Sequence, residues 1–336
     1  DLAQMWIGDD GTLRAVNPEI GIFGIIADVN QEGDPYLMQC LRQPGTEVIF
    51  SNVLVDPDGK PRWTGDGEPV PERGVNFQGT WTRDMTGVPM SHPNSRCTLK
   101  CEAVGNHNKA ANADPAGLCI EVITYSGRDS NTMPPIWVAR TPDAGVAIGA
   151  SIVSKATAAE IGASGVNRQP WANTPFVACQ LTDYLLAQLD FYNNPRMTRK
   201  PVMAGLNYFL THEERGGSGK GLLGEKRDVH VWLGWLELFA HGDVQAIATP
   251  IGLLPKYADL KELFTNKIDK EYPESLYTMQ FSLYIDNIIA RIDLQEAAWR
   301  KEQGASARLF AIYEEQKAAL LKLKAAKGAI VKPQDL

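Results

Sequence analysis

The sequence has no apolar run long enough to span a membrane and no excess of basic residues. Its nearest approach to such a run, residues 145–153, is bounded by Asp143 and Lys155, whereas a spanning helix needs about 20 apolar residues. Lys and Arg number 33 against 40 Asp and Glu, which gives a formal net charge of −7. A general nucleic-acid surface needs a basic face. We therefore expect neither a membrane nor nucleic acid among the partners.

Residues with the spacing of metal or nucleophile motifs are also scarce. The histidines show no metal-ligand spacing, and the five cysteines are odd in number with no second Cys or His pair at zinc spacing. We expect reduced cysteines in a cytoplasmic protein. The absence of a Gly-x-Ser-x-Gly elbow gives a serine hydrolase no support.

A glycine-rich stretch at residues 216–221 reads G-G-S-G-K-G and resembles a phosphate loop only superficially. The phosphate-loop pattern needs a Gly where Glu214 stands and a Ser or Thr where Gly221 stands. We interpret this stretch as a surface loop.

What the sequence does contain predicts a mixed α/β fold that changes character along the chain. Apolar and β-branched runs predict a buried strand within residues 20–29 and further strands at 47–55, 119–125, 136–139 and 146–153. Apolar residues at helical spacing predict helices at 179–192, 229–239, 273–300 and 309–323. We expect a sheet-rich part over 1–265 and a helical extension over 266–336 that packs on it.

The short polar stretch at residues 91–96, S-H-P-N-S-R, is the strongest candidate site. Pro93 fixes its own φ and favours an extended His92. An amide at Asn94 and the guanidinium fork of Arg96 suit a substrate rich in carboxylate and phosphoryl oxygens. The alternative is an Asx-type turn before a strand, with Arg96 in solvent.

Several stretches together resemble the C-terminal, kinase-like part of phosphoenolpyruvate carboxykinases of the GTP-type superfamily. Residues 92–96 are identical to the family's H-P-N-S-R. Weaker matches lie, in the same order as in the family, at residues 1–5, 13–19 (L-R-A-V-N-P-E), 21–24 (G-I-F-G), 48–53 (V-I-F-S-N-V), 63–65 (W-T-G), 154–159 (S-K-A-T-A-A) and 249–252 (T-P-I-G).

The resemblance implies a chemistry and assigns residues to it. Oxaloacetate loses CO₂, and the resulting enolate of pyruvate takes a phosphoryl group, with arginines and divalent metal (Mn²⁺ or Mg²⁺) neutralising the two polyanions. It implies that Asn94 and Arg96 bind the substrate, that Ser95 and Arg96 are catalytic, and that Asp1 is a metal ligand. Arg128 matches the first arginine of the family's G-G-R-R phosphate contact, but Asp129 stands in the second position.

Departures from the family pattern favour the diphosphate-dependent type of the enzyme. Two of four aromatic positions that clamp guanine are Val177 and Leu181, and Lys226 replaces the Asn of the family's P-G-F-G-E-N loop. We expect Arg128 and Lys226 to bind the phosphoryl donor. The GTP-dependent enzyme is the alternative reading, and a non-catalytic paralogue or assembly domain of the same fold is a second alternative.

The resemblance covers only part of such an enzyme. The family's phosphate loop, its Lys and His metal ligands and its substrate-binding half would all precede Asp1. We therefore expect the chain to be a C-terminal fragment, incomplete at its N-terminus, whose partners are the small-molecule substrates and the missing N-terminal part. We expect the fragment alone to be inactive.

Overall fold

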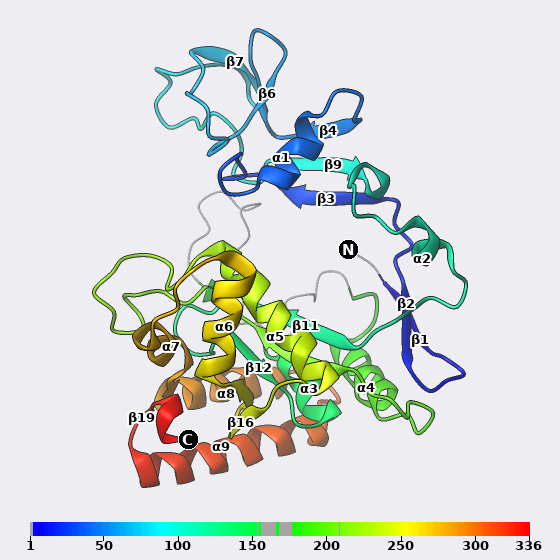
Figure 1. Ribbon diagram of the computed structural model, residues 1–336, viewed down its shortest axis with the longest axis vertical. Helices are drawn as coiled ribbons and strands as arrows, with labels where there is room; N and C mark the ends of the chain where they lie inside the picture. The colour runs from blue at the N-terminus through cyan, green and yellow to red at the C-terminus, as the bar shows by residue number, and fades with distance from the viewer. Residues whose placement is uncertain (1–2, 153, 156–165, 168–176, 208) are drawn as a thin grey trace. The chain divides into compact units, whose positions relative to one another are not determined.

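The computed structural model describes residues 3–152, 154–155, 166–167, 177–207 and 209–336 (Figure 1). The chain divides into two compact units. Unit 1 comprises Asp1–Trp6, Arg14–Leu118 and Thr157–Ala163, and unit 2 comprises Ile7–Leu13, Cys119–Ala156 and Ser164–Leu336. No helix in the described ranges is long and apolar enough to cross a membrane.

Unit 1 is built on two small antiparallel sheets. The first has the order β3-β9-β4, from β3 (Gly21–Ile25), β9 (Arg96–Lys100) and β4 (Val48–Ser51). Helix α1 (Pro35–Arg42) buries Met38, Cys40 and Leu41 in a core that includes Trp63 and the inward residues of β9. The second sheet has the order β6-β5-β7-β8, from β6 (Pro61–Arg62), β5 (Leu54–Val55), β7 (Arg73–Asn76) and β8 (Gly79–Thr82).

Unit 2 contains the large sheet and the main hydrophobic core. The order is β11-β15-β12-β17-β16, from β11 (Val122–Ser126), β15 (Val202–Leu206), β12 (Ile136–Val138), β17 (Gly252–Pro255) and β16 (Ala246–Thr249). Strands β11 and β15 are parallel, and the other pairs are antiparallel. The predicted mixed α/β class is therefore confirmed.

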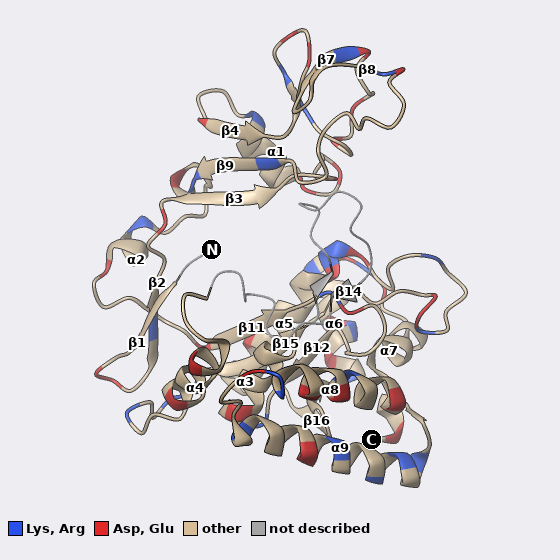
Figure 2. Cartoon of the chain, turned by 180° about the vertical axis from the view of Figure 1, so that it is seen from behind, with Lys and Arg blue, Asp and Glu red and all other residues tan. Residues whose placement is uncertain are grey.

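Helices cover both faces of this sheet. Figure 1 shows α5 (Val229–His241) and α6 (Tyr257–Ile268) over one face. The reverse view in Figure 2 shows α3 (Pro142–Ala150) and α8 (Ile285–Trp299) over the other. The remaining helices of the unit are α4 (Leu181–Tyr192), α7 (Glu274–Phe281) and α9 (Ala307–Lys327).

The other described elements are short. They are β1 (Gln4–Ile7), β2 (Leu13–Val16) and β10 (Leu118–Cys119) in a three-stranded sheet, the pairs β13 (Ser154–Lys155) with β14 (Val166–Asn167) and β18 (Leu283–Tyr284) with β19 (Ile330–Val331), helix α2 (Lys109–Ala113), and the 3₁₀ turns η1 (Cys101–Ala103), η3 (Lys226–Asp228) and η4 (Pro333–Asp335).

Two predicted elements are wrong. The first five residues of the strand predicted at 146–153 lie instead in helix α3, which ends at Ala150 and begins with Thr141 as its N-cap and Pro142 in its first turn. Residues Gly145 to Ala150 are all buried. Because a helix buried on all sides lacks amphipathic periodicity, its apolar run is indistinguishable from that of a buried strand.

The predicted helix at 273–300 is interrupted. Helix α7 ends at Phe281, Ser282 is its C-cap, and β18 precedes the start of α8 at Ile285.

The predicted helix at 309–323 is confirmed as part of α9. Helices α8 and α9 are joined by ion pairs of Lys317 with Asp293 (3.0 Å) and Glu296 (2.6 Å), and Figure 2 shows both signs of charge along them. Unit 2 includes residues on both sides of the boundary predicted at 265, and that boundary stays a prediction.

Candidate functional site

Arg96 and Asn94 lie together in unit 1, at the start of a central strand. Arg96 opens β9, where it is flanked by Ile25 of β3 and Ser51 of β4. Its Nε donates to Asn94 Oδ1 at 2.7 Å, and its guanidinium carbon lies 4.7 Å from the centre of the Phe23 ring. The guanidinium is therefore held between an amide and an aromatic face. A turn does precede the strand, and the Arg96 side chain is partly buried. Binding of substrate by Asn94 and Arg96 stays a prediction.

The turn itself is built by His92 and Ser95. The Ser95 amide donates to the His92 carbonyl at 2.9 Å, and the Asn94 amide donates to His92 Nδ1 at 3.0 Å. Asn52, in the left-handed region at φ 62°, receives the His92 amide on its carbonyl and donates its side-chain amide to the Asn94 carbonyl. These contacts hold the backbone of the turn that carries Asn94 and precedes Arg96. Sequence reasoning assigned no role to Asn52 or His92.

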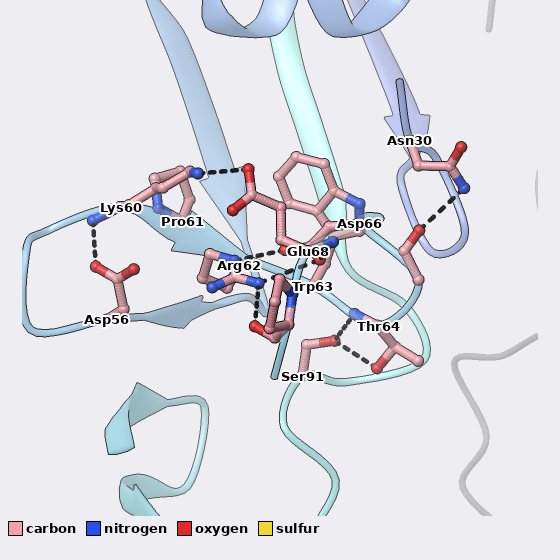
Figure 3. A network of polar contacts seen from close by, with 12 residues as sticks. Asn30, Asp56, Lys60, Pro61, Arg62, Trp63, Thr64, Asp66, Glu68 and Ser91 are labelled. Atoms are coloured by element: carbon pink, nitrogen blue, oxygen red, sulfur yellow. Dashed lines mark hydrogen bonds and ion pairs between the residues drawn. The ribbon is translucent and has the colours of Figure 1, made fainter. Parts of the chain in front are cut away.

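Ser95, predicted as catalytic, is fully buried. Its hydroxyl donates to the His92 carbonyl at 2.6 Å and lies 3.4 Å from Ser91 Oγ. Ser91 Oγ in turn accepts from the Thr64 amide at 2.9 Å and lies 3.1 Å from Thr64 Oγ1 (Figure 3). These hydroxyl groups, linked by hydrogen bonds, stabilise the loop at residues 91–96. A catalytic role for Ser95 stays a prediction.

The segment that carries Thr64 is itself rigid, and this explains the W-T-G motif at 63–65. Trp63 is fully buried and its Nε1 donates to the Val29 carbonyl at 2.8 Å. Gly65 has φ 77°, and a Cβ there would come within 2.7 Å of Asp28 Cα. Asn30 Nδ2 donates to the Gly65 carbonyl at 3.2 Å. Figure 3 shows the buried pair of Arg62 and Asp66, whose Nε and Oδ2 are 2.6 Å apart.

Arg128 lies in unit 2, where β11 ends. Because β11 and β15 are parallel, with Ser126 opposite Leu206, the loops that follow them lie at the same edge of the sheet. The Asn207 side chain joins these loops: its Oδ1 accepts from the Asp129 amide at 3.3 Å and its Nδ2 donates to the Asp129 carbonyl at 2.9 Å. The Arg128 guanidinium carbon lies 5.3 Å from the centre of the Phe209 ring. Ligands commonly bind at such an edge in α/β sheets.

Asp129 makes internal contacts that the resemblance to the G-G-R-R motif did not imply. Its Oδ1 accepts from the amides of Thr132 (2.9 Å) and Asn131 (3.2 Å), and its Oδ2 lies 3.3 Å from Arg291 Nε. Burial alone would raise the pKa of Asp129, but the Arg291 charge and the hydrogen bonds hold the pKa below its usual value. Asp129 is thus an ionised, buried carboxylate that folds the loop after Arg128.

Lys226 is exposed on η3, in a loop that is firmly held around it. Asp228 is buried, accepts from the Glu225 amide at 2.9 Å and pairs with Lys270 Nζ at 2.7 Å. Gln280 Nε2 donates to the Leu223 carbonyl at 2.7 Å. The predicted donor-binding lysine therefore projects from a fixed backbone.

The structure gives little or no contact information for the other predicted site positions. Asp1 and most of the stretches at 154–159 and 170–181 lie outside the described residues. Leu181 is described, and its side chain is buried in the main core of unit 2. The described residues contain no group of three or more His, Cys, Asp or Glu that could hold a metal ion, so we assign none of them to a metal.

Comparison with known proteins identifies the family. Residues 1–319 match the model of the phosphoenolpyruvate carboxykinase C-terminal P-loop domain. The chain belongs to the phosphoenolpyruvate carboxykinase family. This agrees with the resemblance drawn from residues 92–96 and their neighbours.

Relatives of this phosphoenolpyruvate carboxykinase domain are found in archaea and bacteria. The chain is 41% identical over 334 residues to "Phosphoenolpyruvate carboxykinase [GTP]" of Pyrococcus abyssi, covering 97% of the chain and 52% of the relative. The protein of the same name from Thermococcus kodakarensis is 39% identical over 342 residues, with 97% and 53% covered. That from Chlamydia caviae is 32% identical over 264 residues, with 77% and 42% covered. The chain thus spans about half the length of the first two relatives.

Proposed function

We propose that the chain is the phosphoryl-donor-binding part of a GTP-dependent phosphoenolpyruvate carboxykinase, a carboxy-lyase. The observation that carries this proposal is the match to relatives named for GTP over 97% of the chain. The full enzyme would convert oxaloacetate and GTP to phosphoenolpyruvate, CO₂ and GDP. Divalent metal would neutralise phosphate charge in the full enzyme.

One of the arguments for diphosphate is weakened by the position of Leu181 in the core of unit 2. The diphosphate reading rested partly on the lack of an aromatic side chain at Leu181. Leu181 packs in the hydrophobic core. The lack of an aromatic side chain at this position is therefore explained by core packing and is weak evidence against a purine site. Val177 and Lys226 remain the features that favour diphosphate, since Val177 offers no aromatic face and an ammonium suits a phosphate oxygen better than a purine edge.

The residues of unit 1 would act on the substrate. The Arg96 Nε donates to Asn94 Oδ1. In the described part of the chain, the two terminal guanidinium nitrogens are then available to bind an anion. A preorganised guanidinium stabilises negative charge that develops on the enolate oxygen and the moving phosphoryl group. In the same proposal Arg128 and Lys226 contact the phosphates of the donor.

The test is a donor comparison with the full-length protein at equal metal concentration. We expect saturable formation of phosphoenolpyruvate from oxaloacetate with GTP and no saturable activity with diphosphate or ATP. Activity with diphosphate alone would restore the diphosphate type. Inactivity with all three donors in a folded protein would favour the non-catalytic paralogue.

A further inference from the structure

We propose that Arg291 of α8 is a positioning residue for Arg128 and acts through Asp129. The inference rests on the proposed role of Arg128 as a contact to the phosphoryl donor. The inference assigns a role in donor binding to a residue of the C-terminal helices. None of the site residues predicted from the sequence lies in those helices.

Asp129 is where the two residues are connected. It follows Arg128 directly, and its backbone is bound on both sides by the Asn207 side chain. Its carboxylate closes a tight turn on Thr132, whose hydroxyl and amide both donate to it. The main chain of Arg128 is therefore held between the end of β11 and a turn that depends on one carboxylate.

Arg291 supplies the charge opposite that carboxylate. Its side chain is 8% exposed, with Nε 3.3 Å from Asp129 Oδ2. A terminal nitrogen donates to the carbonyl of Ser151, the residue that caps the C-terminal end of α3, where a cation is favoured. The Ser151 hydroxyl lies 3.0 Å from Tyr313 Oη of α9. Arg291 thus ties the Arg128 loop to α3, and Ser151 continues the link to α9.

The surroundings of the pair favour a fixed geometry. Arg291, Ser151, Tyr313 and Met133 line a cavity of about 30 Å³, so the guanidinium has little room to move. Arg215 also faces the turn, and its Nη1 donates to the Asn131 carbonyl at 3.1 Å. A buried ion pair contributes little net stability compared with apolar residues of the same volume. The effect of the Asp129–Arg291 pair is to orient the loop, and this orientation positions Arg128.

The experiment uses the full-length enzyme and whichever of GTP or diphosphate supports turnover. Arg291→Gln alone leaves the buried Asp129 charge without its partner and should destabilise the fold, so the informative variant is the neutral pair Asp129→Asn with Arg291→Gln. We expect it to lower kcat/KM for the donor about tenfold while leaving KM for oxaloacetate unchanged. Arg300→Gln is the matched control, because Arg300 follows the same helix and pairs with Glu296 near the surface.

Adding Arg128→Met to the neutral pair distinguishes an effect on the position of Arg128 from a general loss of structure. If Arg291 acts through Arg128, the neutral pair causes no further loss in the Arg128→Met background. An additive loss, a donor kcat/KM equal to that of the Arg300→Gln control, or an equal rise in KM for oxaloacetate would each overturn the inference.

Failure of the proposed function is distinguishable from failure of the inference. If the wild-type enzyme turns over neither donor, the proposed function fails, and the same variants are compared for binding of GTP with Mg²⁺ by calorimetry. About tenfold weaker binding by the neutral pair, absent in the Arg128→Met background, supports positioning. No binding by the wild-type protein overturns both.

Discussion

Arg96 and Arg128 are both positioned by residues next to them in the chain. Asn94 accepts a hydrogen bond from Arg96 Nε, and Asp129 folds the loop that follows Arg128. Each arginine also lies over an aromatic ring, Phe23 or Phe209, which favours the guanidinium by cation–π attraction. In the proposed ligand-binding roles, these contacts would restrict the two side chains before a ligand arrives and lower the entropy lost on binding.

Replacing Arg96 by Lys tests whether the fork geometry matters beyond the charge. Lysine keeps the positive charge but cannot donate to Asn94 Oδ1 and to an anion in one plane. We expect kcat of the full-length enzyme to fall about 100-fold, the scale for loss of one preorganised electrostatic donor. Arg73→Lys is the control, because Arg73 is exposed at the start of strand β7. Unchanged kcat in the Arg96→Lys enzyme would return Arg96 to the role of a surface residue.

Among the elements, two helices with one apolar face and one short, fully buried apolar strand were predictable from the sequence. The predicted helices at 179–192 and 229–239 correspond to α4 and α5, and the predicted strand at 136–139 corresponds to β12. The strand predicted within 20–29 exists as β3, but Phe23 is 50% exposed within its sheet rather than buried. An apolar run alone does not reveal whether both faces of a strand are covered.

The rest of the fold and site depends on contacts between residues distant in sequence. Asn94 and Arg96 were found because they are adjacent in one motif. The supports of that motif and of Arg128, namely Thr64, Asn207 and Arg291, have no such signal, since each reaches its partner only through the tertiary fold. The interruption of the predicted helix at 273–300 has the same kind of cause, because Arg215 binds the carbonyls of Met279 and Ser282 at 2.8 and 2.7 Å.

Removing Arg215 should therefore destabilise the break between α7 and α8. Arg215 is 1% exposed, and burial lowers its pKa to about 10. Arg215→Met leaves several buried carbonyls without donors, so we expect the free energy of unfolding to fall by about 3 kcal/mol or more. Urea denaturation measures this fall. Exposed Arg196→Met is the control, and an equal effect of the two substitutions would contradict a structural role for Arg215.

At the scale of the whole chain, the two units have separate and unequal hydrophobic cores. The core of unit 2 includes four tryptophans, Trp137, Trp232, Trp235 and Trp299, together with the inward faces of α3 to α9. Unit 1 has a smaller core around Trp63 and a minor one around Trp81. Because stability rises with buried apolar area, the two units should open with different free energies.

Native-state hydrogen exchange of the chain tests this difference, with β9 reporting on unit 1 and β15 on unit 2. We expect the amides of β9 to exchange through openings of lower free energy than those of β15. Leu41→Ala, in the core of unit 1, should lower the opening free energy at β9 by about 2–5 kcal/mol and leave β15 unchanged. Leu185→Ala, in the core of unit 2, should lower the opening free energy at β15 by a similar amount. If either substitution shifted both strands equally, the chain would unfold as one cooperative body, and its two cores would not be energetically separate.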